Sequence, residues 1–348
     1  MAWIFNRMTG DKGEKMKANR KMKTVLGIGN ALVDELIPIE DDALLAEFGL
    51  EKGSMTLVDK KKMNAILERT VSLKVTTEKS TGGSVANSIH GLSQLGTPTG
   101  YIGKIGHDDY GSFFRSFMEQ NNICATLFTG KEDSGKCISL ISTDSERTMA
   151  TYLGAAIELD ASDLTVGPFE GYDYFYLEGY LVQNYALVEK AVKLAREATV
   201  EIAIDLASFN VVEENRDFLD SLVDDYIDIV FANEEEARAF TGKENPGDAL
   251  SEIAKRCKIA VVKTGKKGSL IKEGSNLYKI PPIDANAFDT TGAGDLYASG
   301  FFYGLTGGFP LGICGKMGSI TAGKIVEVIG AKMNEKMWQE ARHLIAAL

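Results

Sequence analysis

The sequence has little of what several large classes of enzyme need. It contains only three histidines in 348 residues, and none of them has metal-ligand spacing to another. Its four cysteines are scattered, without the short paired spacings of a zinc site or a disulfide framework. These shortages disfavour a histidine-dependent hydrolase and a zinc enzyme. They also predict reduced thiols and a cytoplasmic location.

A basic excess and long apolar runs are missing as well. Asp and Glu outnumber Lys and Arg by 49 to 38, which gives a formal net charge of -11. Affinity for nucleic acid comes from clustered Lys and Arg that release counterions, so this balance predicts no nucleic-acid partner. No segment approaches the roughly 20 apolar residues of a membrane span, and the first residues lack an apolar signal-peptide core. We expect residues 1–22 to form a flexible tail and predict no membrane partner.

Residues 23–348 alternate short apolar runs with amphipathic helical stretches. Runs such as YDYFYLEGY, EIAIDLA, DIVFANEEE and IAVVKTG are largely apolar, as expected for parallel strands that are covered on both faces. The alternation predicts βα units and therefore an α/β fold with a mainly parallel central sheet. We expect one main domain with a smaller addition.

Two regions interrupt this alternation with apolar and polar residues in turn and with turn signals. The first covers about 36–60 and 72–80, and the second covers about 123–153 and has the pattern of a hairpin meander. A small antiparallel sheet attached to an α/β core can act as a lid that excludes water from a reaction. Extension of the main sheet and a dimer contact are equally weighted alternatives, so a monomer and a homodimer through the lid both stay open.

The most informative stretch is FDTTGAGDLYASGFFYGLTGG at 288–308. Gly292, Ala293 and Gly294 lead directly into an apolar helix, whose first backbone N–H groups lack helical partners and form an anion hole. Asp295 follows in the first turn, where we expect the helix dipole to lower its pKa and keep it ionised. Such a carboxylate suits a base that takes a proton from an attacking hydroxyl. Read alone, it is more often a helix cap.

The string DTTGAGD resembles the C-terminal signature of the ribokinase, or phosphofructokinase B (PfkB), family of carbohydrate and nucleoside kinases. Further matches follow the family's order from about Thr24 to near the C-terminus. The resemblance implies a ribokinase-like three-layer fold with a small β-sheet lid. It also implies an ATP-dependent phosphotransferase that phosphorylates a hydroxymethyl group of a sugar or nucleoside, with Asp295 as catalytic base and with ATP and Mg²⁺ as cofactors. GNALVDEL, GGSVANS and ERTMATYLGAA look closer to the adenosine kinase-like branch.

Two N-terminal motifs resemble the family's acceptor site. GIGNALVDEL resembles the first strand, which implies that Asn30 and Asp34 contact hydroxyls of the acceptor. TGGSVANSIHGLSQLG resembles the N-terminal signature. It implies that Gly82 and Gly83 approach the sugar and form a lid hinge, and that Asn87 binds a diol. Without the family, a Gly pair at this place is more often a turn before a helix.

Two later motifs resemble the family's nucleotide site. FANEEEARAF matches an Asn-x-x-Glu motif, which implies that Asn233 and Glu236 lie near the phosphates and that Glu236 binds Mg²⁺ through water. KTGKKGSL matches the nucleotide loop, which implies ATP contacts at Thr264, Gly265 and Gly268. On its own, an acidic run at a helix start is usually only a favourable interaction with the helix dipole.

Three further positions have less specific signals. Asp289 and Thr291 match positions that often hold a monovalent cation in the family, and whether K⁺ is required stays open. Arg147, in the segment SERTM, can reach over the acceptor and neutralise phosphate charge, since Arg suits bidentate phosphate contacts. A surface position is nevertheless the more frequent role for such an Arg.

Two alternatives to a kinase stay open at this point. One is a noncatalytic sugar or nucleoside sensor that retained the kinase fold, although the complete Asp295 and glycine motif argues against it. The other is a nicotinamide enzyme that uses GIGNAL, which is weakened because Leu32 stands where a third glycine belongs. The acceptor also stays open. A nucleoside would need an aromatic or apolar pocket, for which Phe209, Tyr152 and Tyr176 are the candidates.

Overall fold

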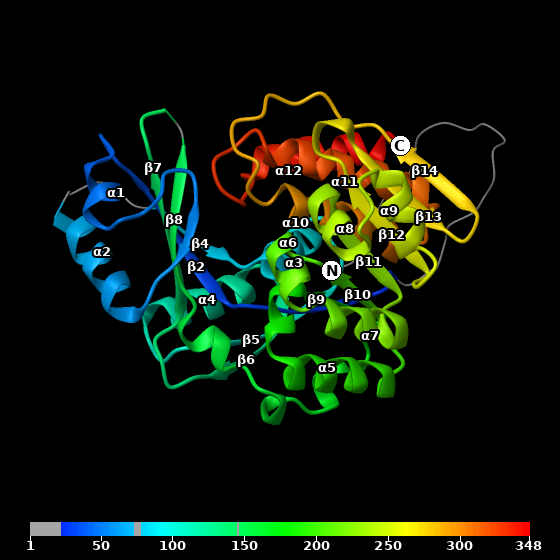
Figure 1. The fold of residues 1–348 in the computed structure, drawn as a ribbon, viewed down its shortest axis with the longest axis horizontal. Coiled ribbons are helices and arrows are strands. Elements are labelled where there is room, and N and C mark those ends of the chain that lie inside the picture. Colours follow the sequence, from blue (N-terminus) through cyan, green and yellow to red (C-terminus); the bar gives the residue numbers. More distant parts are fainter. Residues whose placement is uncertain (1–21, 73–77, 145) are drawn as a thin grey trace, which may run out of the picture.

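The structure is a computed structural model that describes residues 22–72, 78–144 and 146–348. The predicted tail up to residue 21 and residues 73–77 of a predicted lid segment lie outside the described residues. A large sheet is flanked by helices on both faces, and a smaller sheet lies beside this main body (Figure 1). The predicted α/β fold, with a mainly parallel central sheet and a second small sheet, is confirmed.

The large sheet is parallel from β12 to β6 and ends in two antiparallel strands at its other edge. In spatial order its strands are β14 (Asn276–Ile280), β13 (Ser269–Glu273), β12 (Ile259–Lys263), β11 (Ile229–Asn233), β10 (Glu201–Asp205), β9 (Tyr174–Glu178), β1 (Val25–Ile28), β5 (Thr99–Ile105) and β6 (Ile123–Thr129). From β1 the chain first builds outward through β5 and β6, and then returns to β9 on the other side. The strand order therefore reverses between β1 and β9, where open α/β sheets bind ligands at the carboxyl ends of the strands.

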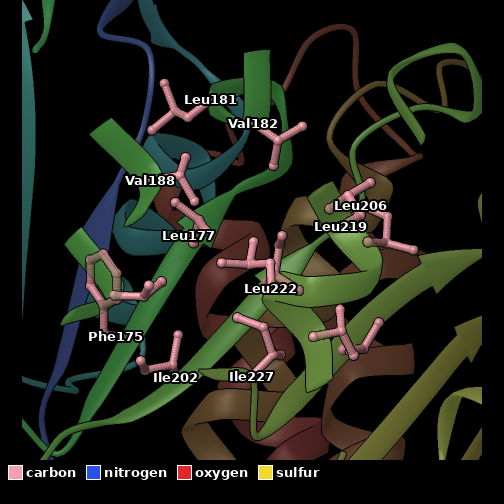
Figure 2. Close-up of a cluster of buried hydrophobic side chains, with 14 of the residues drawn as sticks. Phe175, Leu177, Leu181, Val182, Val188, Ile202, Leu206, Leu219, Leu222 and Ile227 are labelled. Atoms are coloured by element: carbon pink, nitrogen blue, oxygen red, sulfur yellow. The ribbon is translucent and has the colours of Figure 1, made fainter. Parts of the chain in front are cut away.

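Helices cover both faces of this sheet because its strands are apolar on both sides. One face packs on α5 (Tyr185–Glu197), α6 (Phe209–Glu214), α7 (Arg216–Tyr226), α8 (Glu234–Thr241) and α9 (Pro246–Ile253). Figure 2 shows Phe175 of β9 and Ile202 of β10 in this core, together with Leu219 and Leu222 of α7. The other face packs on α3 (Ser84–Gln94), α4 (Asp109–Gln120), α10 (Ala293–Thr306) and α11 (Leu311–Ile325). The last helix, α12 (Glu335–Ala346), packs on α11, and no helix in the described ranges could cross a bilayer.

The small sheet contains, in spatial order, β3 (Met55–Leu57), β8 (Arg147–Tyr152), β7 (Gly135–Ile141), β2 (Leu32–Pro38) and β4 (Glu78–Gly82). One face packs on α1 (Ala43–Glu47) and α2 (Lys60–Ser72), which lie on the side away from the main body (Figure 1). The predicted hairpin is β7–β8, but the sheet is mixed rather than antiparallel. Strands β2 and β7, and likewise β3 and β8, pair in parallel, which the long connections between them permit.

Part of the predicted lid belongs to the main body instead. Residues 123–129 form β6, which pairs in parallel with β5 at the edge of the large sheet. Helix α4 makes the crossover between these two strands. An edge strand is exposed along one side, so its residues alternate between apolar and polar in the same way as those of a small half-covered sheet. The pattern alone therefore could not separate the two locations.

Candidate active site

A buried carboxylate and an asparagine meet where the strand order reverses. Asn30 follows β1, and Glu178 ends β9. The Asn30 side chain donates to Glu178 Oε1 at 2.7 Å, and the backbone N–H groups of Asn30 and Val85 donate to the same carboxylate at 3.3 and 3.2 Å. Burial raises the pKa of Glu178 to about 7, although these donors act to lower it. The sequence predicted Asn30 but missed Glu178, whose signal is a charge at the end of an apolar strand.

Asp295 lies in the first turn of α10, and two side chains at the start of α3 hold it. Ser84 Oγ donates to one carboxylate oxygen at 2.6 Å, and Asn87 Nδ2 donates to the other at 2.9 Å. The expected lowering of its pKa by the helix dipole is wrong. Burial raises the pKa of Asp295 to about 6, and the two donors only partly oppose this rise. At pH 7 the ionised form still predominates.

Small residues bring α3 and α10 close enough for these contacts. A Cβ atom built on Gly91 of α3 would lie 2.4 Å from Ser299 Oγ of α10, so no larger residue fits there without a shift. Ser299 Oγ donates to the carbonyl oxygen of Ser88 at 2.9 Å, and Ser88 Oγ donates to the carbonyl oxygen of Asp295 at 3.0 Å. The two helix starts are therefore held side by side, which brings the donors of α3 to the Asp295 carboxylate.

The predicted anion hole is only partly available in this structure. Gly292 adopts a left-handed conformation with a φ of 75°, where glycine is favoured, and begins α10. Within the described part of the chain the N–H groups of Gly292 and Gly294 have no hydrogen-bond partner. The N–H group of Ala293, in contrast, donates to the carbonyl oxygen of Thr290 at 3.1 Å. Two of the three predicted amides are thus free to meet an anion.

An ion pair that the sequence left without a role lies beside these amides. Lys263, at the end of β12, donates to Asp205 at the end of β10 at 2.7 Å. Burial lowers the pKa of Lys263, but the carboxylates of Asp205, Glu236 and Asp295 outweigh it and raise the pKa. A Cβ atom on Gly294 would lie 3.1 Å from the lysine Nζ, so this ammonium reaches the start of α10. Both residues follow apolar runs, as Glu178 does.

Asn233 and Glu236 cap α8. Asn233 Oδ1 accepts from the Glu236 N–H at 2.8 Å, and Glu236 accepts from the Asn233 N–H at 2.8 Å and from its side-chain amide at 2.6 Å. This reciprocal capping box accounts locally for the motif. Burial raises the pKa of Glu236 to about 7, although Lys263 acts to lower it.

The predicted nucleotide loop follows β12 directly, at the same edge of the sheet. The Thr264 N–H donates to the carbonyl oxygen of Gly268 at 2.8 Å across the turn Gly265–Lys267. Gly268 has a φ of +94°, and a Cβ atom there would lie 1.9 Å from the carbonyl oxygen of Ile280. This turn therefore requires glycine at position 268, whatever the loop binds.

The two predicted hinge glycines each allow a close approach, Gly82 within the small sheet and Gly83 between the start of α3 and the segment that follows β1. A Cβ atom on Gly82 would lie 2.3 Å from Asp34 Oδ1, and one on Gly83, whose φ is +94°, would lie 2.2 Å from the carbonyl oxygen of Asn30. Burial raises the pKa of Asp34, while Arg147 acts to lower it. The predicted acceptor residues of β2 and α3 are thus brought together at one place.

Arg147 is not a surface residue but connects the small sheet to the loop before α10. It is 9% exposed and donates to Asp289 at 3.3 Å and to Ser139 Oγ at 2.9 Å. Asp289 also accepts from the N–H and hydroxyl of Thr291, at 2.8 and 2.6 Å, and from the N–H of Gly330 at 2.8 Å. Burial acts to raise the pKa of Asp289, but these donors and the Arg147 charge outweigh it and lower the pKa.

Two further findings concern residues outside the motifs. Lys332 Nζ, which no motif indicated, donates to Asn87 Oδ1 at 2.8 Å. Two of the three candidates for an aromatic pocket, Tyr176 and Tyr152, lie in separate surroundings, and the third, Phe209, is exposed at the start of α6. Tyr176 is fully buried and donates to Asp205 at 3.3 Å, whereas Tyr152 donates to Glu132 at 3.0 Å.

Comparisons with known proteins agree with this architecture. The model of the pfkB family of carbohydrate kinases matches residues 53–337. The 5-dehydro-2-deoxygluconokinase of Bacillus licheniformis is 27% identical over 307 residues, which cover 82% of this chain and 93% of that protein. A probable sugar kinase from Rhizobium etli is 30% identical with a TM-score of 0.83, covering 93% of this chain and 99% of that one. Adenosine kinase from Sinorhizobium meliloti is 30% identical with a TM-score of 0.82, covering 93% and 100%.

Proposed function

Because the chain belongs to the PfkB family of carbohydrate kinases, we propose that it transfers the γ-phosphoryl group of ATP to a hydroxymethyl group of a sugar or nucleoside. The observation that carries this proposal is the position of Asp295. Its carboxylate is oriented by Ser84 and Asn87 and lies in the first turn of a helix whose Gly292 and Gly294 amides have no partner among the residues that the structure describes. Phosphoryl transfer needs a base for the hydroxyl proton and stabilisation of the moving charge.

In the proposed reaction the acceptor oxygen attacks the γ-phosphorus in line with the leaving ADP oxygen. Asp295 takes the proton of the hydroxyl as the new P–O bond forms and the bond to ADP breaks, so that the products are ADP and the phosphorylated acceptor. The free amides of Gly292 and Gly294 donate to the phosphoryl oxygens. Asp34, Asn30 and Asn87 orient the acceptor, and the small sheet serves as the lid.

The nucleotide lies, in this proposal, along the carboxyl ends of β11 and β12. Asn233 and Thr264, with the turn glycines Gly265 and Gly268, are the candidate contacts. Glu236 would hold Mg²⁺ through water, and the metal would neutralise phosphate charge, which suits a carboxylate that lies beside a phosphate site. The Asp289 carboxylate does not fit a monovalent cation, because its oxygens already accept from four donors that include Arg147. A contact with such a cation is therefore proposed for Thr291 alone.

A nucleoside is the acceptor class that the small sheet favours. Its face that carries Asp34 also carries Leu36, which neighbours Ser139 and through it Met149. Leu36 and Met149 are partly exposed on this face. Apolar side chains beside hydroxyl-binding polar groups suit a ligand with a flat apolar part, such as a nucleobase. The sugar acid named for the Bacillus licheniformis relative is the alternative.

An acceptor panel tests the proposal. The protein is incubated with Mg-ATP and with adenosine, other nucleosides, neutral sugars and 5-dehydro-2-deoxygluconate, while ADP formation is recorded and products are identified by mass. We expect ADP to appear only with an acceptor that gains one phosphoryl group, and not with the Asp295→Asn variant. Acceptor binding in calorimetry without any ADP formation would contradict the proposal and indicate a sensor.

A further inference from the structure

Lys332 lies in the segment between α11 and α12, at the centre of the site but outside every sequence motif. Its side chain is partly buried and packs over the ring of Phe117 of α4, with Nζ 5.3 Å from the ring centre. Its hydrogen bond goes to Asn87 Oδ1 at 2.8 Å. This lysine is therefore attached to the same asparagine that donates to Asp295.

The chemistry of the two side chains decides which way the Asn87 amide points. A lysine ammonium can only donate, so the amide oxygen must face Lys332. The amide nitrogen then faces Asp295 and donates to its Oδ2 at 2.9 Å. Without Lys332, either end of the amide could face the carboxylate, and the oxygen end would repel it.

The charge of Lys332 also favours the ionised form of the carboxylates near it. The titratable groups that face it are Asp34 on β2, Asp295 on α10 and His90 on α3. Burial lowers the pKa of Lys332 to about 8, while the two aspartates act to raise it, so the ammonium form predominates at neutral pH. The lysine thus places one positive charge beside the two carboxylates of the proposed reaction.

We propose that Lys332 is a positioning residue, which holds the Asn87 amide in the orientation that aims Asp295 and keeps it ionised. This role rests on the proposed kinase function and deepens it. Lys332 does not take part in proton transfer. It acts on the base through Asn87 and through its charge.

The test compares Lys332→Met with the wild type and with Lys336→Met, an exposed lysine of α12 that serves as the matched control. Turnover, KM for ATP and the pH profile of kcat/KM are measured with the acceptor that the panel identifies. We expect Lys332→Met to lower kcat about tenfold, the effect of losing one hydrogen bond at a charged site, with KM for ATP unchanged. Loss of the positive charge should raise the pKa of Asp295 and move the acid limb of the profile to higher pH.

Two further variants keep the test decisive. Lys332→Arg restores the charge and the donor and should bring the acid limb back, whereas Lys332→Gln keeps a donor without charge and should leave the limb displaced. Lys332→Gln also replaces the Met variant if the latter unfolds. An acid limb identical to that of the wild type in an active Lys332→Gln or Lys332→Met enzyme would overturn this role alone. A wild type without turnover on any acceptor would overturn the kinase function and this role with it.

Discussion

Asp289 and Asp295 lie in one short segment at the start of α10, yet their surroundings shift their pKa values in opposite directions. Asp289 accepts from four donors, one of them the guanidinium of Arg147, and its pKa is lowered. Asp295 accepts from two neutral side chains, and burial raises its pKa to about 6. The balance between burial and donors, rather than the position near a helix start, decides which carboxylate is strongly held in its charged form.

The difference separates a structural aspartate from a reactive one. Asp289 connects the loop before α10 to Arg147 of the small sheet and to Gly330 before α12. Asp295, whose charge is only partly compensated, keeps a higher affinity for a proton, as a base requires. Substitutions at the two positions should therefore have opposite consequences for activity and for stability.

The largest effect is expected from Asp295→Asn. Loss of the base should lower kcat by about 10²- to 10⁴-fold, with ATP affinity retained. Stability should not fall at pH 7, because a carboxylate whose folded pKa lies above the ordinary 3.8 is unfavourable when ionised. Any gain of the variant over the wild type in the free energy of unfolding should disappear as pH falls from about 6 to 3.8. Steady-state kinetics and thermal unfolding at several pH values check both parts.

Gly83→Ala should disturb the donors of Asp295 without touching its carboxylate. The new Cβ atom would meet the Asn30 carbonyl oxygen at 2.2 Å, and the φ of +94° is strained for alanine. We expect a loss of about 2 to 5 kcal/mol in the free energy of unfolding and a marked drop in kcat. Gly49→Ala is the control, since Gly49 also has a positive φ but has open space around it. An equal loss in both variants would contradict the steric explanation.

Asp289→Asn should mainly lower stability, whereas Asp295→Asn should mainly lower activity. It removes a carboxylate that is stabilised in its charged form, so the free energy of unfolding should fall by about 1 to 3 kcal/mol at pH 7. Since the folded pKa lies below the ordinary 3.8, this loss should persist until pH falls below that value. Denaturant unfolding at pH 7 and pH 5 measures it. Equal stability of variant and wild type would remove the structural role assigned to Asp289.

The smallest effect is expected from Ser84→Ala, which removes one of the two donors to Asp295. The pKa of Asp295 should rise, so the acid limb of kcat/KM should lie at higher pH than in the wild type. Loss of this hydrogen bond should cost about 1 kcal/mol of transition-state stabilisation, which corresponds to a several-fold lower kcat. Ser93→Ala, farther along α3, removes a hydrogen bond to the Asn121 carbonyl oxygen and should leave the limb unchanged. A limb that moves in both variants would point to a general disturbance of α3.

Motifs of contiguous residues were the part of the site that the sequence could predict. The Gly83 turn before α3, the Asn233 cap of α8 and the Gly292 start of α10 all have local causes, in helix ends and in conformations that favour glycine. Glu178, Lys263 and Lys332 were missed because each is one charged residue without a local pattern. Residues 123–129 were misplaced because an edge strand and a lid strand share the same alternation.

The α/β class and the parallel strands follow from local order along the chain, because helix ends, buried strands and glycine turns are set by near neighbours. The proposed base, in contrast, was identified from the resemblance of the string DTTGAGD to a family signature. The pairing of segments across the molecule follows from packing alone. Packing places β6 in the large sheet and brings Lys332 to Asn87. It also shifts the pKa values of Asp295 and Asp289 in opposite directions. The physical reason is that burial, donors and charges at a carboxylate come from elements far apart in the chain, and these meet only in the folded protein.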